Sequence, residues 1–285
     1  MALNIKTFFT RLGSAAVFSA IMLAGLLMNE WAFIALFFVI NILCLREYAN
    51  LVEFILQTKF TQNEKVNFVA IGVALFLTVI ALPISVCDNF ISLVLSKYVF
   101  HFLGFVIGAM LIFLFFRKNK KSIYLLTGLG YISVAFGFLV QMRFQSLLLP
   151  LILILFIWMN DTMAYLTGSF IGKTPFFPSI SPKKTIEGTI GGIVFCMVFA
   201  FIWGSLTNWF PISVWIMFGL IAGVVGTAGD LVESKLKRMA GVKDSGAMMP
   251  GHGGALDRFD SLLLASPFAF LVAMIFEVCK VYKVF

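Results

Sequence analysis

The acidic residues are concentrated in one part of the chain, and their types and spacing could support metal chemistry. Seven of the thirteen lie between positions 160 and 260: Asp161, Glu187, Asp230, Glu233, Asp244, Asp257 and Asp260. Several adjoin apolar stretches, where an ionised group is costly and usually marks a functional site. If the local backbone is helical, Asp230 and Glu233 share one helix face, and so do Asp257 and Asp260.

Carboxylates that converge from three helix ends suit a hard divalent cation. Mg²⁺ takes one or two carboxylates together with water and substrate phosphates. The candidates at the three helix ends are Asp161, the pair Asp230 and Glu233, and the pair Asp257 and Asp260. The alternative for Asp161 and Asp257 is helix capping, because a carboxylate stabilises the N-terminal end of a helix dipole. Capping accounts for one or two of these acids, but not for the whole set.

Basic residues and glycines lie between the acids and favour phosphate binding. Segment 181–188, SPKKTIEG, joins two lysines and two hydroxyl groups to a predicted helix start at Gly188. Lysines act as point charges for phosphate, and helix N-terminal N–H groups add to them, although two lysines alone would more often form a solvated loop. Segment 234–260 adds bases and glycines that allow close approach or positive φ. They are Lys237, Arg238, Lys243, Arg258, Gly251, Gly253 and Gly254.

The two histidines and the four cysteines have different surroundings in the sequence. His252 could contact substrate, act as an acid or base, or pack within a turn, and substrate contact is favoured because bases and aspartates flank it. His101 lies inside an apolar stretch and is expected to make a polar helix–helix contact. The cysteines have no disulfide or metal-ligand spacing and are expected to be small buried hydrophobes. They are Cys44, Cys87, Cys196 and Cys279.

The elements that must position these residues are membrane helices. Of the 285 residues, 61% are hydrophobic and 12% charged, with mean hydropathy +1.03, which is far more apolar than a soluble domain. The apolar runs are continuous, so they predict an all-α polytopic integral membrane protein and not a β-barrel. Nine spans are expected, near 12–29, 31–50, 66–87, 97–116, 123–142, 147–168, 188–209, 212–230 and 259–279. Segment 47–60 is amphipathic and is expected to lie along the membrane surface.

The distribution of positive charge predicts the topology. With nine spans, the loops on the N-terminal side contain all but four of the 21 Lys and Arg residues. The exceptions are Lys97, Arg143, Lys280 and Lys283. This asymmetry places the N-terminus and the predicted site, at the ends of the C-terminal helices, in the cytoplasm. We expect the protein to lie in the inner membrane. We divide the chain into N-terminal helices (1–95), middle helices (96–146) and a C-terminal catalytic domain (147–285).

Segment 234–260 resembles the signature of the phosphatidate cytidylyltransferases, the CDP-diacylglycerol synthases. The matching positions are Ser234, Leu236, Lys237, Arg238, Lys243, Asp244, His252, Gly253, Gly254, Asp257, Arg258 and Asp260. Met249 and Ala255 depart from the pattern, where a larger aliphatic or aromatic residue is usual. Upstream motifs also match, at Asn160-Asp161, Ala164-Tyr165, Gly168, Gly172-Lys173, Ser181 to Thr185, Glu187-Gly188 and Gly229-Asp230.

The resemblance implies that CTP and phosphatidate give CDP-diacylglycerol and pyrophosphate at a Mg²⁺ centre. In the family, aspartates that match Asp230 and Asp257 hold the Mg²⁺, and Asp260 and Asp161 would support that centre. A monovalent cation such as K⁺ sometimes lies beside the Mg²⁺. The implied catalytic residues are Asp230, Asp257, Asp260, Lys237, Arg238 and Arg258. The implied substrate-binding residues are Asn160, Lys173, Ser181, Lys183, Lys184, Thr185, Lys243, His252, Gly253 and Gly254. The resemblance also implies lipid entry sideways from the bilayer and a homodimer.

Two other functions would also place charged groups beside membrane helices. In a CTP-dependent polyprenol or phytol kinase, a lipid alcohol attacks the γ-phosphorus, and a base is needed to remove its proton. Phosphatidate needs no such base, because a phosphate monoester is already anionic near neutral pH. A transporter would show repeated halves and polar residues near span centres, whereas the charges here lie at span ends. No nucleic-acid partner is expected.

Overall fold

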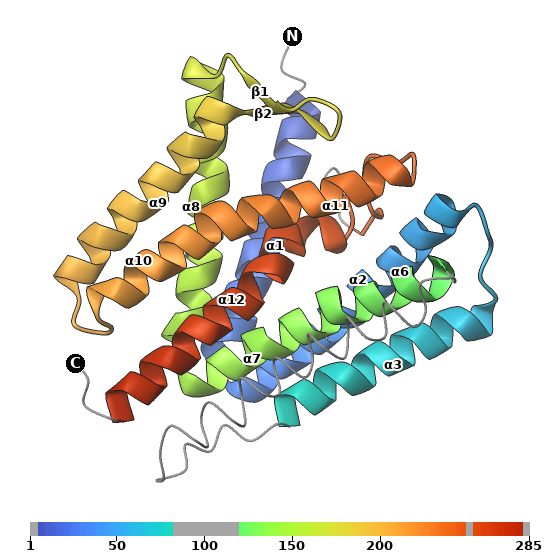
Figure 1. Ribbon diagram of the computed structural model, residues 1–285, viewed down its shortest axis with the longest axis horizontal. Coiled ribbons are helices and arrows are strands. Elements are labelled where there is room, and N and C mark those ends of the chain that lie inside the picture. Colours follow the sequence, from blue (N-terminus) through green and yellow to red (C-terminus); the bar gives the residue numbers. More distant parts are fainter. Residues whose placement is uncertain (1–4, 82–119, 249–252, 282–285) are drawn as a thin grey trace.

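The computed structural model describes residues 5–81, 120–248 and 253–281, which are almost entirely helical (Figure 1). The first helices are α1 (Ile5–Met28), α2 (Glu30–Leu56), α3 (Gln62–Ala81), α6 (Lys120–Gly128) and α7 (Ala135–Gln145), with the π-helical segment η2 (Leu129–Val134) joining α6 to α7. The later helices are α8 (Leu148–Ile171), α9 (Ile186–Leu206), α10 (Ile212–Leu220), α11 (Thr227–Met239) and α12 (Leu256–Val281), with η3 (Ile221–Gly226) joining α10 to α11.

One feature departs from the all-α expectation. A short antiparallel hairpin connects α8 to α9, formed by β1 (Pro175–Phe177) and β2 (Ser181–Thr185). Pro175 pairs with Thr185, and Phe177 pairs with Ser181. The hairpin lies near the end of the molecule where α1 begins (Figure 1). It gives segment 181–185 an extended backbone, so that its side chains project from a fixed strand.

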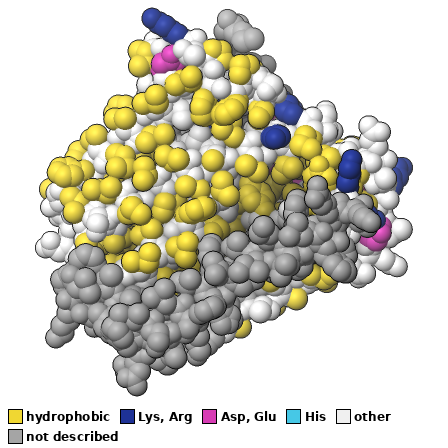
Figure 2. All heavy atoms as spheres, in the orientation of Figure 1, with side chains coloured by type: hydrophobic (Ala, Val, Ile, Leu, Met, Phe, Trp, Pro, Cys, Tyr) yellow, Lys and Arg dark blue, Asp and Glu magenta, His cyan; other side chains and the backbone are white. Residues whose placement is uncertain are grey.

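The protein is an integral membrane protein by the length and apolarity of its helices. Within the described ranges, seven helical spans are long and apolar enough to cross a bilayer, while α1 adds a shorter apolar stretch, Ala16–Met28. The expected span 97–116 falls outside the described residues, so the count of nine stays a prediction. Figure 2 shows hydrophobic side chains over the face that includes α9 and α10, with Lys and Arg side chains at its edges.

Helix α2 corrects one expectation about the chain after Arg46. We expected segment 47–60 to lie along the membrane surface, but α2 runs unbroken to Leu56. The reason is packing, because Tyr48 and Val52 are buried. The Tyr48 hydroxyl donates to the carbonyl of Tyr124 at 2.9 Å. The helix therefore brings its last turns into the bundle and not onto its periphery.

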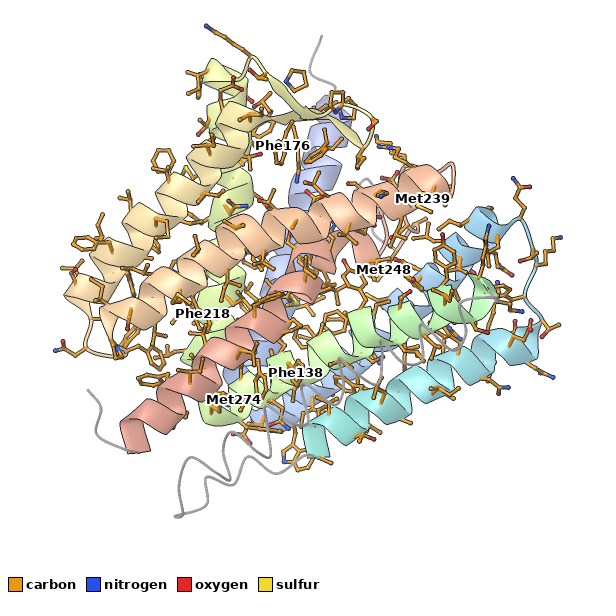
Figure 3. All side chains as sticks on the ribbon, viewed as in Figure 1. Phe138, Phe176, Phe218, Met239, Met248 and Met274 are labelled. Atoms are coloured by element: carbon orange, nitrogen blue, oxygen red, sulfur yellow. The ribbon has the colours of Figure 1, made fainter. Side chains whose placement is uncertain are left out.

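Aromatic packing fixes the start of α12. The rings of Phe37 on α2, Phe136 on α7 and Phe259 on α12 lie 5.3 to 6.0 Å apart, centroid to centroid. Further along, Phe138 stacks on Phe270 at 4.5 Å, in the α7–α12 interface seen in Figure 3. Since Phe259 lies between Arg258 and Asp260 in sequence, this core determines where the first turn of α12 presents its polar side chains.

A glycine allows α11 to approach α12 closely. A Cβ atom on Gly229 would lie 2.6 Å from the carbonyl oxygen of Asp260 and 3.1 Å from Cβ of Leu264. Any larger residue would separate the two helices. The contact brings Asp230, the next residue, beside the first turn of α12.

Candidate active site

Five aspartates line one cavity of about 600 Å³ between α1, α8, α11 and α12. They are Asp161, Asp230, Asp244, Asp257 and Asp260. Two cationic side chains, Lys237 and Arg258, lie among them. The rest of the wall is largely apolar and includes Phe18, Met22, Ile154, Ile157, Trp158 and Leu262. The cavity therefore combines a charged region with an apolar wall.

A second cavity, of about 440 Å³, lies between α8, α9, β2 and α11. Its polar lining includes Asn160, Lys183, Lys184, Thr185, Thr189 and Thr227. Asp161 and Asp230 line both cavities. The two spaces therefore adjoin at these carboxylates, and a group bound there could be reached from either side.

The hairpin and the start of α9 position the basic side of the second cavity. Helix α9 begins at Ile186, close to the predicted start, and the side chain of Thr185 caps it by accepting a hydrogen bond from the Gly188 amide at 3.1 Å. Glu187 holds the preceding turn by accepting from the amides of Lys173 and Thr174, each at 3.1 Å. These contacts fix β2 against α8 and direct Lys184 toward α11.

Asp230 is the acidic partner of that lysine. Its carboxylate forms an ion pair with the ammonium of Lys184 and accepts a hydrogen bond from the Ser234 hydroxyl at 3.1 Å. The side chains of Lys184 and Asp230 are both about one quarter exposed. The pair is therefore accessible from the cavity, and a bound anion could compete with Asp230 for the lysine.

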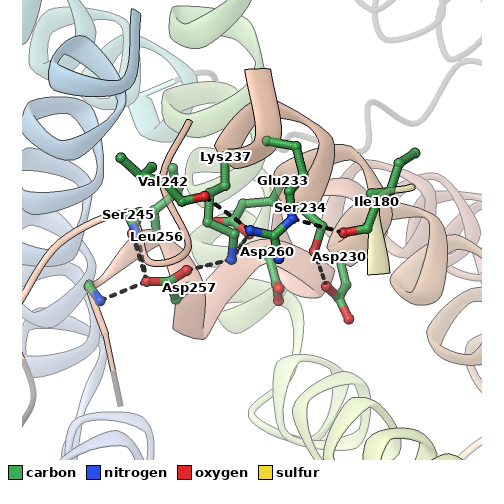
Figure 4. Close-up of polar contacts among 12 residues, drawn as sticks. Ile180, Asp230, Glu233, Ser234, Lys237, Val242, Ser245, Leu256, Asp257 and Asp260 are labelled. Atoms are coloured by element: carbon green, nitrogen blue, oxygen red, sulfur yellow. Dashed lines mark hydrogen bonds and ion pairs between the residues drawn. The ribbon is translucent and has the colours of Figure 1, made fainter. Parts of the chain in front are cut away.

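A buried ion network lies beside this pair (Figure 4). The ammonium of Lys237 contacts the carboxylates of Glu233 and Asp257, the latter at 2.6 Å. The side chain of Glu233 is fully buried, and that of Asp257 is 5% exposed. Although Asp230 and Glu233 lie on one helix, as predicted, Glu233 turns into this network and does not line either cavity.

The two acids with a capping alternative have different environments. One oxygen of Asp257 accepts from the amides of Ser245 and Gly254, each at 2.8 Å, so it binds the loop before α12 and not the free amides of the helix itself. Asp161 lies well inside α8, so capping is the wrong interpretation for this residue. Its carboxylate faces the cavities instead.

The structure brings together only part of the predicted site. Of the predicted residues, those that line a cavity are Asn160, Asp161, Lys183, Lys184, Thr185, Asp230, Lys237, Asp257, Arg258 and Asp260. Arg238 instead donates to the carbonyls of Ile180 and Val242, both at 3.1 Å, and so joins α11 to the hairpin turn. Others do not line these two cavities, namely Lys173, Ser181, Lys243, Gly253 and Gly254.

The remaining predictions concern the loop before α12 and the cysteines. Gly253 adopts positive φ, +82°, as the glycine pattern predicted. Cys44 and Cys196 are buried free thiols, as expected. Gly251, His252, His101 and Cys87 lie outside the described residues, as does the side chain of Cys279. Sequence reasoning missed Glu47, whose carboxylate binds this loop from α2; the only signal was an acid near the end of an apolar stretch.

The donors in the first cavity fit a hard cation. Among the described residues, no three His, Cys, Asp or Glu side chains form a ready-made metal cage. The ligands offered by the lining are carboxylate oxygens, which Mg²⁺ prefers, and Mg²⁺ commonly uses one or two of them with substrate phosphates. Asp161 and Asp230 are the two carboxylates that line both cavities.

Comparison with known proteins identifies the family of this chain. A family model described as "Cytidylyltransferase family" matches residues 9–276. The chain belongs to the cytidylyltransferase family. This confirms the family resemblance of segment 234–260 and extends it over most of the protein.

Two similar proteins are both named phosphatidate cytidylyltransferase. A phosphatidate cytidylyltransferase of Staphylococcus aureus is 44% identical over 156 residues, 53% of this chain and 60% of the relative. One from Staphylococcus haemolyticus is 36% identical over 200 residues, 68% of this chain and 75% of the relative. The alignment thus spans less than two thirds of the Staphylococcus aureus protein.

Proposed function

We propose that this cytidylyltransferase transfers CMP from CTP to phosphatidate, giving CDP-diacylglycerol and pyrophosphate. The observation that carries the proposal is the pair of adjoining cavities that share Asp161 and Asp230. One side is basic, with Lys183 and Lys184, and the other has an apolar wall. A reaction between a nucleoside triphosphate and a lipid phosphate needs both kinds of space at one point. The names of the relatives support this choice of substrates.

The two substrates are assigned by the chemistry of the walls. We place the triphosphate beside β2 and the start of α9, where lysines and helix N–H groups favour anions. We place phosphatidate in the first cavity, with its phosphate near Arg258 and its acyl chains along the apolar wall that includes Phe18 and Ile154. In this arrangement the lipid enters sideways from the bilayer.

The reaction is an in-line displacement at phosphorus. An anionic oxygen of the phosphatidate phosphate attacks the α-phosphorus of CTP, and the bond to the β-phosphate oxygen breaks as pyrophosphate leaves. Because the attacking oxygen is already ionised, no side chain has to remove a proton. Lys184 and Arg258 neutralise the crowded phosphates, and the cavity walls hold them in line.

We propose that Mg²⁺ binds at Asp230, with Asp161 and Asp257 as further donors and Asp260 supporting them. The cation would neutralise charge on the phosphoryl group in transfer. The proposal includes a neighbouring monovalent cation such as K⁺ at the same carboxylates. Asp257 already bonds to Lys237, Ser245 and Gly254, so Asp161 and Asp230 are the more accessible donors.

The proposal also fixes the setting of the enzyme. We place the site at the cytoplasmic side of the inner membrane, because the basic residues collect on that side in the predicted topology. We also propose a homodimer, which the family resemblance implies. No feature of the described residues favours the alternative lipid kinase.

A product assay tests the proposed function. The purified full-length protein is incubated with cytosine-labelled CTP and phosphatidate, and in parallel with γ-phosphate-labelled CTP and a polyprenol. We expect the cytosine label to enter the lipid fraction and pyrophosphate to be released in equal amount. Transfer of the γ-phosphate to the prenol, with no cytidine lipid formed, would instead identify the kinase.

Substitution of Lys184 tests the placement of the phosphates. Lys184→Gln removes the charge and is expected to raise KM for the substrate phosphate that it contacts about tenfold, the scale of one charge-assisted hydrogen bond. KM is measured separately for CTP and phosphatidate. Lys59→Gln, at an exposed position remote from both cavities, is the control for loss of a surface charge. If both KM values stay within about twofold of wild type, Lys184 serves only as the ion partner of Asp230.

A further inference from the structure

A glutamate from the N-terminal part of the chain binds the loop that precedes α12. The carboxylate of Glu47, on α2, accepts hydrogen bonds from the amides of Ala255 at 2.9 Å and Leu256 at 2.8 Å. It also accepts from the hydroxyl of Ser245 at 2.8 Å. The three donors lie about 200 residues away in sequence. One side chain therefore joins α2 to both ends of segment 245–256.

Two glycines show how closely the loop fits around this carboxylate. A Cβ atom on Gly246 or on Gly254 would collide with the Glu47 side chain. Neither glycine has a described positive φ that would explain its presence. Their lack of a side chain instead makes room for Glu47, so the carboxylate occupies a space that the loop leaves open.

The contacts continue from Glu47 to the cavity. The Ser245 hydroxyl lies 2.8 Å from Glu47 and 3.0 Å from Asp257, and the Ser245 amide donates to the same Asp257 oxygen. The other oxygen of Asp257 binds Lys237, which lines the cavity. Each step is a direct hydrogen bond, so a shift of the loop at Glu47 would displace Asp257.

We propose that Glu47 is a positioning residue, which orients Asp257 and Lys237 by holding the loop before α12. This proposal deepens the proposed function and rests on it for its kinetic consequence. The carboxylate charge is favourable at this place, because it accepts from two amides at the N-terminus of α12, where helix amides have no intrahelical partner. The N-terminal helices thus contribute a necessary contact to a site whose cavity-lining acids all come from the C-terminal half.

The test combines amide exchange with kinetics on the full-length protein in detergent. Glu47→Gln removes the charge but keeps one acceptor oxygen, so the protein is expected to fold. We expect the amides of Ala255 and Leu256 to exchange at least about tenfold faster. We expect kcat to fall about tenfold or more, with KM for CTP changed less than about threefold.

The matched control is Glu53→Gln on the same helix. Glu53 also accepts from a backbone amide, that of Phe60, and pairs with Lys65, but it lines neither cavity. This variant should speed exchange near Phe60 only and leave kcat unchanged. Ser245→Ala, combined with Glu47→Gln, should cost less than the sum of the two single changes because both act through Asp257.

The outcomes separate the two proposals. Unchanged kcat in Glu47→Gln overturns the positioning role, and so does a fall in kcat without faster exchange at Ala255 and Leu256. Strictly additive effects with Ser245→Ala also overturn it. If the wild-type protein transfers no cytidine nucleotide to phosphatidate, the proposed function fails, and the exchange measurement alone decides whether Glu47 holds the loop.

Discussion

Asp230→Asn is expected to lower kcat about a hundredfold to a thousandfold, the scale seen when a preorganised electrostatic group is removed from an active site. Asp230 lines both cavities and is the acidic partner of Lys184. Asparagine keeps the shape and the contact with Ser234 but removes the negative charge that a cation would need. Initial rates of CMP transfer at saturating CTP and phosphatidate give kcat directly.

A matched carboxylate distinguishes this effect from a general loss of charge. Glu64 forms an ion pair with Lys121 at 2.5 Å but is remote from both cavities. Glu64→Gln should keep kcat within about twofold of wild type, because an exposed surface pair that lines neither cavity contributes little. Retention of more than about a tenth of wild-type kcat by Asp230→Asn would exclude Asp230 from the catalytic centre.

Lys237→Met is expected to lower the free energy of unfolding by about 3–5 kcal/mol, the cost of removing one partner from a buried ion pair. The change leaves Glu233, whose side chain is fully buried, without its cationic partner. Asp257 loses the same partner but keeps its bonds to Ser245 and Gly254. Denaturation of the detergent-solubilised protein, followed by circular dichroism, measures the effect.

Two further variants make this prediction specific. Lys235→Met is the control, because Lys235 is exposed on the same helix and should change the free energy of unfolding by less than about 0.5 kcal/mol. Adding Glu233→Gln to Lys237→Met removes the unpaired buried charge and should restore part of the lost stability. If Lys237→Met is as stable as Lys235→Met, the buried network does not stabilise the fold.

Much of the fold could be predicted because the bilayer constrains it strongly. Backbone groups in hydrocarbon must be satisfied within a helix, so continuous apolar runs predicted the helices reliably. The start of α9 was expected at Gly188 and lies at Ile186, where Thr185 provides the cap. The C-terminal concentration of aspartates predicted the location of the cavity in outline. Ionised groups next to apolar helices are costly in lipid, so they face a shared polar site.

Other features depend on contacts that hydropathy does not encode. Segment 47–56 belongs to the helix bundle because Tyr48 and Val52 pack inward, and segment 181–185 is a strand because it pairs with 175–177. Arg238 belongs to the same basic run as Lys237, yet one joins α11 to the hairpin turn and the other lies in the buried network. The rotation of α11 about its own axis decides which of the two side chains faces the buried network. The packing of α11 against α12 sets that rotation.

The sequence by itself therefore determined that the protein lies in a membrane and that its acids and bases are grouped in the C-terminal half. The physical reasons are the apolarity of the helices and the free-energy cost of placing charged groups in lipid. The sequence motifs also identified the family, which the comparisons confirm. Only the tertiary structure decided which acids face the cavities and which pair internally, because that depends on helix contacts such as Gly229 against Asp260. The contact of Glu47 with the α12 loop joins segments about 200 residues apart, so it exists only once α2, α11 and α12 have packed together.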